Sequence, residues 1–315
     1  MISRDEAAAV LRAADDILIL CHQYPDGDTL GSATALCRGL QKLGKRAMIK
    51  CSDSIAPKYN YLFSGVEQQV FSPKMITAVD IADIQLLGEP NESLYGGCID
   101  LCIDHHPSNT SYAKRSCVDA TAAATCEIIF DILNLLDVEI DREIADCLYT
   151  GITTDTGCFK YINVTPRTYR IAADLAEKGA DDNRINREMF DTKSRARIEM
   201  ERRVMETIRY FYDNRVAVIK ITCEMIESAG ATQSDIEGLA SIPRAIEGVL
   251  VGVTLREKPD GSCKISLRAR PPINASEICA VFGGGGHSGA AGCTFQTSME
   301  QAEEQMLQEI GKHFL

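Results

Sequence analysis

The sequence predicts an α/β protein with two domains, a parallel-sheet domain in the first half and a smaller α/β domain at the end. The chain has 315 residues, enough for each domain to bury its own core. Its first half alternates short apolar runs with helical stretches, the pattern of a parallel sheet with crossover helices. Its last third carries short strands and a turn. We expect domains at residues 1–182 and 213–315, joined by a helical linker at residues 183–212.

The composition is that of a folded globular protein. Apolar residues make up 45% of the chain and charged residues 25%, both ordinary values. No apolar run approaches the roughly 18 residues that cross a bilayer, and the N-terminal residues lack the features of a signal peptide. We therefore expect no membrane partner and a cytoplasmic location. The net charge of −12 argues against nonspecific binding of long nucleic acid, but not against a short anionic substrate.

The chain contains 13 cysteines, an odd number with no CxxC pair. Many of them lie inside apolar segments, where free cysteine packs as a small hydrophobe. We therefore expect reduced thiols rather than a disulfide framework.

In the first half, apolar runs predict buried strands at residues 17–20, 47–51, 75–79 and 98–103. Helices are predicted at residues 29–43, 121–136 and 142–149. Gly44 closes the first of these helices, and Asp141 is the expected N-cap of the last.

Residues 181–212 form a charged stretch that is rich in arginine. Its apolar positions fit one face of a helix; they are Ile198, Val204, Met205, Ile208 and Phe211. We predict a solvated helical connector between the domains, and a nucleic-acid-binding patch is the competing interpretation.

The last third contains predicted strands at residues 216–221, 249–255 and 263–269, the last two joined through a turn at residues 258–261. Ser298, followed by Gln301 three residues later, predicts a capping box at the start of the final helix. These elements make up the smaller α/β domain.

His22, Asp26 and Asp28 lie together in the segment after the first strand. Carboxylates and neutral imidazoles are ligands for divalent metal ions, and Pro25 and Gly27 keep the loop tight enough for these side chains to converge. The alternative is an N-cap for the following helix, a role that Asp28 fits in part. A cap needs one acceptor, however, and not three metal-type ligands.

Asp104, His105 and His106 directly follow the apolar run at residues 98–103. The carboxyl ends of parallel strands form the edge of the sheet where ligands bind, so two such clusters in one chain favour a metallohydrolase. Adjacent residues on an extended segment point in opposite directions. Only one of the two histidines therefore easily reaches a given metal ion, which leaves the other for a substrate phosphate.

Two single aspartates are weaker candidates for the same site. Asp80 ends the apolar run at residues 75–79, and Asp155 lies in a segment of threonines and glycines after a predicted helix. Either residue alone suits a turn or a cap. Asp83 and Asp119 compete with them for such roles.

A glycine-rich motif occupies residues 282–292. It contains a run of glycines followed by a histidine: Gly283, Gly284, Gly285, Gly286 and His287. Consecutive glycines expose backbone N–H groups that bind an anion, and the histidine can add a donor; the alternative is a flexible loop. Arg268 and Arg270, on the preceding strand, either give forked donors to a phosphate or are ordinary exposed strand residues.

Together these segments resemble the DHH phosphoesterases that carry a C-terminal DHH-associated domain, and the resemblance covers almost the whole chain. Five motifs carry it in order: His22-x-x-Pro-Asp-Gly-Asp28, Val79-Asp80, Asp104-His-His-Pro-Ser-Asn109, Thr150-Gly-Ile-Thr-Thr-Asp-Thr-Gly157 and Gly283-Gly-Gly-Gly-His-Ser-Gly-Ala-Ala-Gly292. Five motifs in one order are highly specific. They remove the ambiguity of Asp80 and Asp155.

The resemblance implies a parallel-sheet DHH domain with two divalent metal ions, usually manganese. By matching position, one ion would be held by His22, Asp26 and Asp80, and the other by Asp28, Asp80, His105 and Asp155. Asp80 would bridge the two ions. A water activated between them would attack phosphorus.

The resemblance also implies roles for residues around the ions. His106 would contact the scissile phosphate. Asp104 belongs to neither ligand set, so its expected place is behind the ligands, where it orients a histidine. The substrate-binding residues would be Asn109, Arg268, Arg270, Gly284, Gly285, Gly286 and His287.

Within the family, the two-domain architecture looks most like the nanoRNase type. The expected function is manganese-dependent hydrolysis of short single-stranded oligoribonucleotides to mononucleotides, or of 3′-phosphoadenosine 5′-phosphate to AMP. The alternatives are a phosphodiesterase for linear or cyclic dinucleotides and a catalytically inactive nucleotide-binding sensor. Leu86 stands where the family often has arginine, so the resemblance carries no substrate contact over to this position. The sequence does not give the oligomeric state, and a homodimer stays open.

Overall fold

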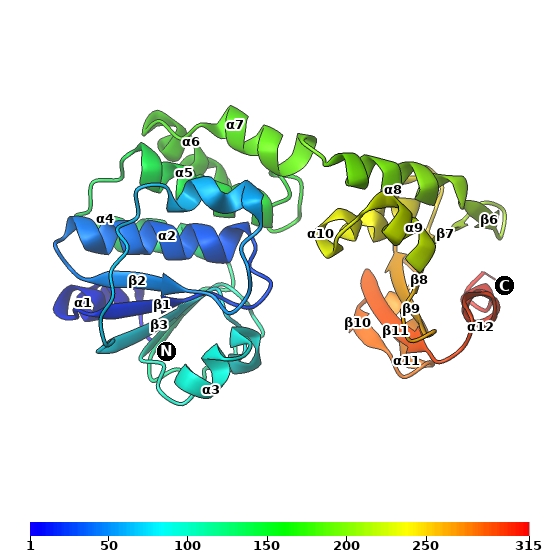
Figure 1. The fold of residues 1–315 in the computed structure, drawn as a ribbon, viewed down its shortest axis with the longest axis horizontal. Coiled ribbons are helices and arrows are strands. Elements are labelled where there is room, and N and C mark those ends of the chain that lie inside the picture. The colour runs from blue at the N-terminus through cyan, green and yellow to red at the C-terminus, as the bar shows by residue number, and fades with distance from the viewer. Residues whose placement is uncertain (315) are drawn as a thin grey trace. The chain divides into compact units, whose positions relative to one another are not determined.

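The computed structural model describes residues 1–314 of the chain. The chain divides into two compact units, residues 1–192 and the residues from Lys193 onward. Each unit has helices and a sheet of its own (Figure 1). The predicted α/β class is therefore confirmed. The division falls within the segment predicted as a linker, whose limits at residues 183–212 stay a prediction.

The first unit is built on a five-stranded parallel sheet in the order β2-β1-β3-β4-β5. Its strands are β1 (Ile17–Leu20), β2 (Ala47–Lys50), β3 (Met75–Val79), β4 (Leu101–Asp104) and β5 (Ser116–Val118). Its longer helices are α1 (Arg4–Ala13), α2 (Gly27–Lys42), α4 (Thr125–Leu135), α5 (Arg142–Asp155) and α6 (Pro166–Glu177). Its shorter helical segments are η1 (Pro57–Phe63), η2 (Ile84–Leu87), α3 (Asn91–Tyr95), α7 (Asp182–Asn186) and the π-helical turn η3 (Arg187–Asp191).

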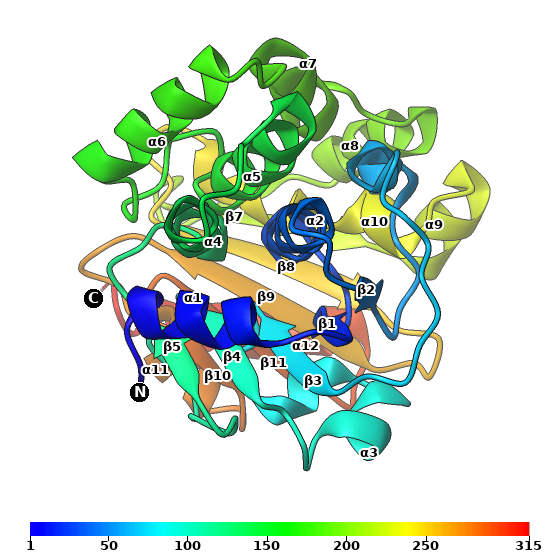
Figure 2. The same ribbon diagram turned by 90° about the vertical axis from the view of Figure 1, so that its left-hand side faces the viewer.

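Both faces of this sheet are buried. Along β1, Ile17 and Ile19 pack into a large core with side chains of α1, α2 and α4, which cover one side of the sheet (Figure 2). Leu18 and Leu20 pack into a smaller core on the opposite face. Burial on two sides explains why the strand is a continuous apolar run and not an alternating one.

Helices α2 and α5 pack closely because glycines line their contact. A Cβ atom on Gly27 would lie 2.3 Å from Oγ1 of Thr154, and one on Gly31 would lie 2.4 Å from the carbonyl oxygen of Cys147. Moving forward along α2 thus means moving backward along α5, so the two helices are antiparallel. The N-terminal turn of α2 therefore lies beside the C-terminal turn of α5.

Two elements in this unit begin later than predicted. Helix α4 starts at Thr125 and not at residue 121, because Asp119 accepts hydrogen bonds from Thr121 and holds these residues in a turn. Strand β4 starts at Leu101 and includes Asp104, so residues 98–100 precede it.

Helix α5 is longer than predicted and runs to Asp155. Threonine and glycine suggested a loop after residue 149, but the threonine hydroxyl groups bond back to carbonyl oxygens one turn earlier. Thr150 donates to Asp146 at 2.6 Å and Thr154 donates to Thr150 at 2.8 Å. Asp155 therefore ends a helix instead of following one.

The second unit contains a six-stranded mixed sheet in the order β10-β11-β9-β8-β7-β6, in which β7 and β8 are parallel. Its strands are β6 (Arg209–Phe211), β7 (Val216–Ile221), β8 (Val251–Glu257), β9 (Cys263–Ala269), β10 (Gly285–His287) and β11 (Ala290–Phe295). Its helical elements are α8 (Arg195–Glu206), α9 (Cys223–Ala229), α10 (Gln233–Ile236), η4 (Leu239–Ser241), η5 (Pro243–Ala245), α11 (Ala275–Ala280) and α12 (Met299–Gly311).

One face of this second sheet packs on α11 and α12, and part of the other face packs on α8. Ser298 is the N-cap of α12, and its hydroxyl group accepts a hydrogen bond from the Gln301 N–H at 3.4 Å.

The segment predicted as a connector is largely helical, but it is not one continuous helix. The helix breaks at residues 192–194, a new one starts with Ser194 as its N-cap, and residues 209–211 form an edge strand. Ile198 and Met205, expected on the apolar face, are each 52% exposed. The predicted apolar face therefore combined residues of helix α8 with a residue of strand β6.

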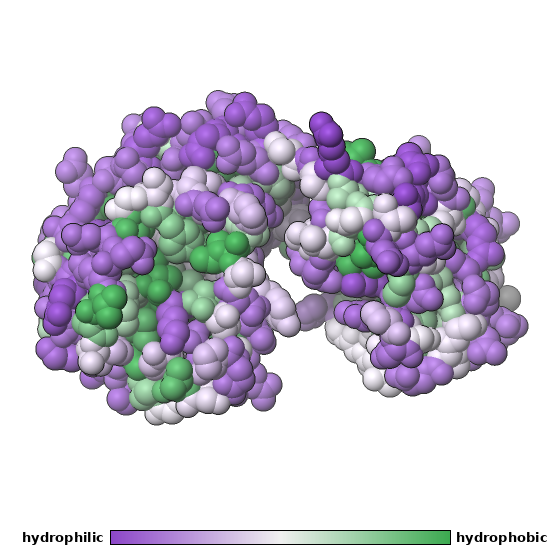
Figure 3. Space-filling view, in the orientation of Figure 1, coloured by the Kyte–Doolittle hydropathy of each residue, from purple (hydrophilic) through white to green (hydrophobic). Residues whose placement is uncertain are grey.

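Hydrophilic side chains surround isolated apolar patches on the visible surface of each unit (Figure 3), as in most globular proteins. Among residues 1–314, no helix is both long and apolar enough to cross a membrane. All thirteen cysteines are free.

We expect Gly31→Ala to lower the free energy of unfolding by about 1–3 kcal/mol, because the added methyl group overpacks the contact between α2 and α5. Urea denaturation followed by circular dichroism measures the change. Gly97→Ala is the matched control, since a Cβ atom there has no neighbour within 4 Å; it should change stability by less than about 0.5 kcal/mol. Equal, small effects at both positions would contradict the close helix contact.

Candidate metal centre

Three neighbouring strands of the first unit end at the same edge of its sheet, and candidate ligands follow each of them. The strands are β1, β3 and β4, which lie side by side in the sheet. They lead to His22, Asp26 and Asp28, to Asp80, and to Asp104, His105 and His106, respectively. The antiparallel packing of α2 on α5 brings Asp155 to the same place.

Asp80 directly follows β3 and is only 3% exposed. Its backbone is left-handed, with φ at 60°, a conformation that aspartate tolerates better than most residues. Its N–H donates to Ile103 O at 2.9 Å, and its Oδ1 accepts from the Thr125 hydroxyl group at 2.9 Å. These contacts fix the carboxylate at the centre of the cluster.

Asp28 caps a helix other than its own. Helix α4 begins after Ala124, which has no side chain for capping, and the Asp28 carboxylate accepts instead from Thr125 N–H at 2.6 Å and Cys126 N–H at 3.0 Å. The positive end of the α4 dipole therefore faces a carboxylate that is 1% exposed. No local pattern in the sequence identifies Thr125 and Cys126, because the contact joins distant segments.

The N-cap of α2 is Asp26 and not Asp28. Its Oδ1 accepts from Asp28 N–H at 3.0 Å and from Thr29 N–H at 3.1 Å. Asp26 thus has the capping role that was predicted in part for Asp28.

The imidazole of His22 presents an unprotonated nitrogen to two carboxylates. Its Nδ1 lies 2.6 Å from the carbonyl oxygen of Gln23, so Nδ1 donates to that oxygen and, in the neutral imidazole, Nε2 carries the lone pair. Nε2 lies 3.6 Å from Asp26 Oδ1 and 3.7 Å from Asp80 Oδ2. These separations are too long for hydrogen bonds.

His105 is arranged in the same way on the other side of Asp80. Its Nδ1 lies 3.2 Å from the carbonyl oxygen of Ala122, which leaves the lone pair on Nε2. This buried Nε2 atom has no hydrogen-bond partner among residues 1–314. It lies 3.6 Å from Asp80 Oδ1, 3.5 Å from Asp155 Oδ2 and 4.0 Å from Asp28 Oδ2.

A nitrogen that faces carboxylates at distances too long for hydrogen bonds leaves room for a cation between them, and both histidines meet this condition. Ligand atoms about 2.1 Å from one ion lie roughly 3–3.5 Å apart, close to the spacings of 3.5–4.0 Å found here. Three triads have ligand atoms within 4.8 Å of one another: His22, Asp26 and Asp80; Asp28, His105 and Asp155; Asp80, His105 and His106. Because the two oxygens of Asp80 face different histidines, the geometry fits two ions that share Asp80.

Asp104 organises the segment that follows β4. Its Oδ1 accepts from His106 Nδ1 at 2.8 Å and from His105 N–H at 2.8 Å, and its Oδ2 accepts from the Asn109 amide at 2.6 Å. The hydrogen bond to Asp104 raises the pKa of His106. His106 is 41% exposed, so Asp104 orients a histidine that reaches solvent.

Three carboxylates of the cluster, those of Asp28, Asp80 and Asp155, have raised pKa values and resist ionisation when no cation is bound. Burial raises the pKa of Asp80 well above its ordinary range, and the charges of Asp28 and Asp26 add to this effect. Burial and the charge of Asp28 raise the pKa of Asp155 to about 8. Such like-charged groups in a low dielectric are characteristic of metal and catalytic sites.

The two competing aspartates have other partners. Asp83 is the N-cap of η2 and accepts from Gln85 N–H at 3.0 Å. Asp119 forms an ion pair with Arg4 and hydrogen bonds with Thr121. Both have structural roles away from the two histidines.

The glycine-rich motif of the second unit forms a hairpin and not a flexible loop. Gly285, Gly286 and His287 make up the edge strand β10, which pairs with β11. A Cβ atom on Gly284 would lie 2.2 Å from the carbonyl oxygen of Gly292, and one on Gly286 would lie 2.5 Å from that of Ala290. These glycines therefore allow two backbones to approach closely, and an edge strand keeps unpaired N–H groups for a ligand.

Arg268 and His287 lie in one row across this sheet. Ala290 on β11 pairs with His287 on one side and with Arg268 on the other. Paired residues share a face of the sheet, so both side chains flank the small Ala290, at a backbone separation of roughly 10 Å. Arg270 lies after β9, is exposed, and donates to the Arg244 carbonyl oxygen at 2.9 Å.

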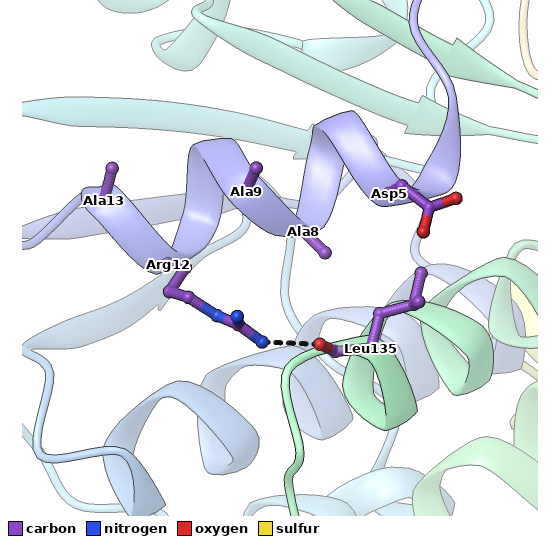
Figure 4. A pocket seen from close by; sticks show the side chains of 6 residues that line it. All are labelled: Asp5, Ala8, Ala9, Arg12, Ala13 and Leu135. Atoms are coloured by element: carbon purple, nitrogen blue, oxygen red, sulfur yellow. Dashed lines mark hydrogen bonds between the residues drawn. The ribbon is translucent and has the colours of Figure 1, made fainter.

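A surface cavity of about 360 Å³ lies elsewhere on the first unit, between α1 and the end of α4 (Figure 4). It is lined by Asp5, Ala8, Ala9, Arg12, Ala13 and Leu135. Arg12 points across it and donates to the Leu135 carbonyl oxygen at 2.6 Å. None of the candidate ligands lines this cavity, and we assign no function to it.

Comparison with known proteins identifies both halves of the chain. Residues 16–152 match the DHH family, N-terminal domain, and residues 213–314 match the DHHA1 domain. A protein of Thermus thermophilus named bifunctional oligoribonuclease and PAP phosphatase NrnA is 32% identical over 310 residues, which cover 96% of this chain and 92% of that protein.

Two further comparisons also span nearly the whole chain. A probable bifunctional oligoribonuclease and PAP phosphatase NrnA of Streptococcus mutans is 27% identical over 304 residues, 96% of each chain. The crystal structure of an exopolyphosphatase-related protein from Bacteroides fragilis superposes with a TM-score of 0.87 at 25% identity, covering 99% of this chain and 96% of that one.

We expect the metal-free protein to lose stability as pH rises. The raised pKa values of Asp80 and Asp155 mean that the folded chain binds more protons than the unfolded chain between about pH 4 and the value near 8. The free energy of unfolding then falls with increasing pH in this range. Thermal unfolding in EDTA at pH 5 and pH 8 tests this, and added MnCl₂ should raise Tm more at pH 8.

The test variant is Asp155→Asn, which should reduce this pH dependence. The matched control is Asp83→Asn, which should leave it unchanged. A metal-free Tm that rises with pH, or one that Asp155→Asn does not affect, would contradict the proposed crowding of carboxylates.

Proposed function

Because the chain belongs to the DHH family and continues into a DHHA1 domain, we propose that it is a metal-dependent phosphoesterase acting on short oligoribonucleotides and 3′-phosphoadenosine 5′-phosphate. The similarity to the Thermus thermophilus protein supports this proposal, because it covers 92% of that protein, whose name states both activities. Within the structure, the unpartnered Nε2 of buried His105 carries the most weight. It faces three carboxylates, an arrangement that serves a divalent cation and has no evident structural use.

The ligand sets proposed for the two ions follow the geometry. The first comprises His22, Asp26 and Asp80, and the second comprises Asp28, Asp80, His105 and Asp155. Manganese is our proposal for the ion in the cell. The donors are oxygen atoms and neutral imidazoles, which suit this ion.

When bound, two such ions lower the pKa of a water and neutralise phosphate oxygens. The chain supplies the remaining groups. His106 is held at Nδ1 by Asp104 and is free to donate from Nε2 to a phosphate oxygen, and its raised pKa keeps that proton in place. We propose that Asn109 binds substrate. Its side-chain amide also donates a hydrogen bond to Asp104 and so stabilises the pairing of Asp104 with His106.

We propose that the second unit binds the substrate nucleotide or its terminal phosphate. Arg268 and His287 flank Ala290 on one sheet face, where a phosphate can accept hydrogen bonds from both side chains. The edge-strand glycines Gly284, Gly285 and Gly286 add backbone donors, and Arg270 adds charge. We also propose that the protein is cytoplasmic, that it forms a homodimer and that its linker spans residues 183–212.

Two other functions use the same site. A phosphodiesterase for linear or cyclic dinucleotides needs the same ions, and only substrate preference separates it from the leading proposal. A nucleotide-binding sensor without catalysis would not need every ligand. The full set of converging ligands favours an enzyme.

Asp80→Ala is expected to lower kcat/KM by about a thousandfold or more, since the shared ligand positions both ions and these supply several kcal/mol of charge stabilisation. Initial rates with manganese on diribonucleotide to pentaribonucleotide RNA, 3′-phosphoadenosine 5′-phosphate and cyclic dinucleotides measure the loss. They also rank the substrates. Asp83→Asn, whose side chain only caps η2, should retain activity. Near-normal turnover by Asp80→Ala would contradict the two-ion site.

Arg268→Ala should raise KM about tenfold or more with a smaller change in kcat, because a charge-assisted hydrogen bond is worth about 1.5–3 kcal/mol in binding. Steady-state kinetics on the preferred substrate separate the two constants. Lys264→Ala is the control, since Lys264 lies on the same strand and the same face. A fall in kcat alone would place Arg268 in the chemical step instead.

A further inference from the structure

Tyr24 lies in the middle of the metal-binding loop, and its side chain is unusually placed. It is 80% exposed, and its backbone is left-handed, with φ at 56°. A bulky residue seldom adopts this conformation, which costs free energy. An exposed ring gains little free energy from packing, so contacts within the folded chain do not offset the cost of this backbone conformation.

The loop backbone on both sides of this ring is anchored. The Tyr24 N–H donates to Asp53 Oδ2 at 2.9 Å, and the Gln23 N–H donates to the Leu86 carbonyl oxygen at 2.7 Å. The ring of Pro25 fixes the φ angle of the next position in the loop. The ring is therefore held in solvent by a fixed backbone and not by a mobile loop.

Three other tyrosines of the first unit are placed differently, whereas Tyr161 and Tyr169 are exposed as Tyr24 is. The hydroxyl groups of Tyr61, Tyr112 and Tyr149 each form a hydrogen bond within the unit, and these side chains are largely buried. Within residues 1–314, the structure shows no such bond for the Tyr24 hydroxyl group. Among residues 1–314, neither burial of the ring nor a hydrogen bond of its hydroxyl group therefore explains the position of the Tyr24 side chain.

Leu86 is an exposed apolar residue beside the loop that carries this ring. Its side chain is 40% exposed, and the hydrogen bond from Gln23 to its carbonyl oxygen places it against the same loop. The surface beside the loop is thus apolar at Leu86.

The ring is close enough to the ions to contact a nucleoside whose phosphate is bound there. Tyr24 is two residues from His22 and two from Asp26, so its Cα atom is within about 7 Å of each of theirs. A phenol side chain adds several ångströms of reach. A base attached to the scissile phosphate through its ribose would come within stacking distance of this ring.

We propose that Tyr24, with Leu86 beside it, is a stacking platform for the nucleobase next to the scissile phosphate. Aromatic side chains bind successive bases in this way without regard to sequence, because every base offers a flat π face. The inference rests on the proposed phosphoesterase function and adds a determinant of substrate choice. Substrates that carry a base at this position gain affinity, with purines favoured over pyrimidines.

The first test combines a protein variant with a change in the substrate. Tyr24→Asn removes the ring but retains a residue that tolerates positive φ, so the loop keeps its shape. With a diadenylate substrate we expect KM to rise about tenfold, the loss that one stacked base typically causes. With diadenylate analogues that lack either base, the analogue without the stacked base should bind wild type and variant equally. Tyr24→Phe should behave as wild type.

A second measurement does not depend on turnover. A dinucleotide that contains 2-aminopurine and a methylene group in place of the bridging oxygen cannot be hydrolysed, and stacking quenches its fluorescence. The chain has no tryptophan, so the signal is free of interference. Binding to the manganese-loaded protein should quench fluorescence with wild type and Tyr24→Phe, and much less with Tyr24→Asn.

The outcomes separate this inference from the proposed function. Val70→Ala, a substitution of a 97% exposed residue in the segment before β3, should change neither measurement. Hydrolysis of diadenylate with equal losses on intact and base-free substrates would overturn the stacking role and leave the phosphoesterase standing. No hydrolysis of any substrate by wild type would overturn the proposed function, and unquenched 2-aminopurine would then reject the platform as well.

Discussion

A group of aspartates that share one small buried space is the constraint on which the first unit depends. Asp28 and Asp80 are almost fully buried, and the ion pairs shown for them involve only histidines. Buried carboxylates without a cation are costly, and their mutual repulsion adds to the cost. The fold is therefore arranged for ions that the polypeptide does not itself supply, and metal binding becomes part of its stability.

The structural features that position these aspartates each serve two purposes. The glycines between α2 and α5 permit a close helix contact, and the same contact brings Asp155 beside Asp28. Asp28 caps α4 and is also a proposed ligand. Asp80 adopts a left-handed backbone that aims its two oxygens at different histidines. Since packing and ligand geometry depend on the same residues, few substitutions could alter one without the other.

The sequence predicts the parallel sheet and most candidate ligands because both leave local patterns. Strands buried on two sides are continuous apolar runs, and the ligands follow them directly, as Asp80 follows β3. The partners of those ligands leave no local pattern. Thr125 donates to Asp28 and Asp80 across large sequence separations, and the full length of α5 depends on hydroxyl groups that bond back to its own carbonyl oxygens. The strand pairing of the glycine motif with Ala290 is likewise a tertiary contact, so the sequence did not reveal the hairpin.

Recognition of the substrate is divided between two kinds of chemistry, and this division follows from what each unit can offer. The sheet face of the second unit presents Arg268 and His287, which attract any phosphate and read no base. Metal ions held by the proposed ligands would do the same at the scissile bond. A phosphoesterase built only from these parts would not distinguish a nucleotide from another phosphate ester. An exposed aromatic ring such as that of Tyr24 supplies the missing contact, since π stacking selects a base but tolerates its identity, as an enzyme that degrades RNA fragments of any sequence requires.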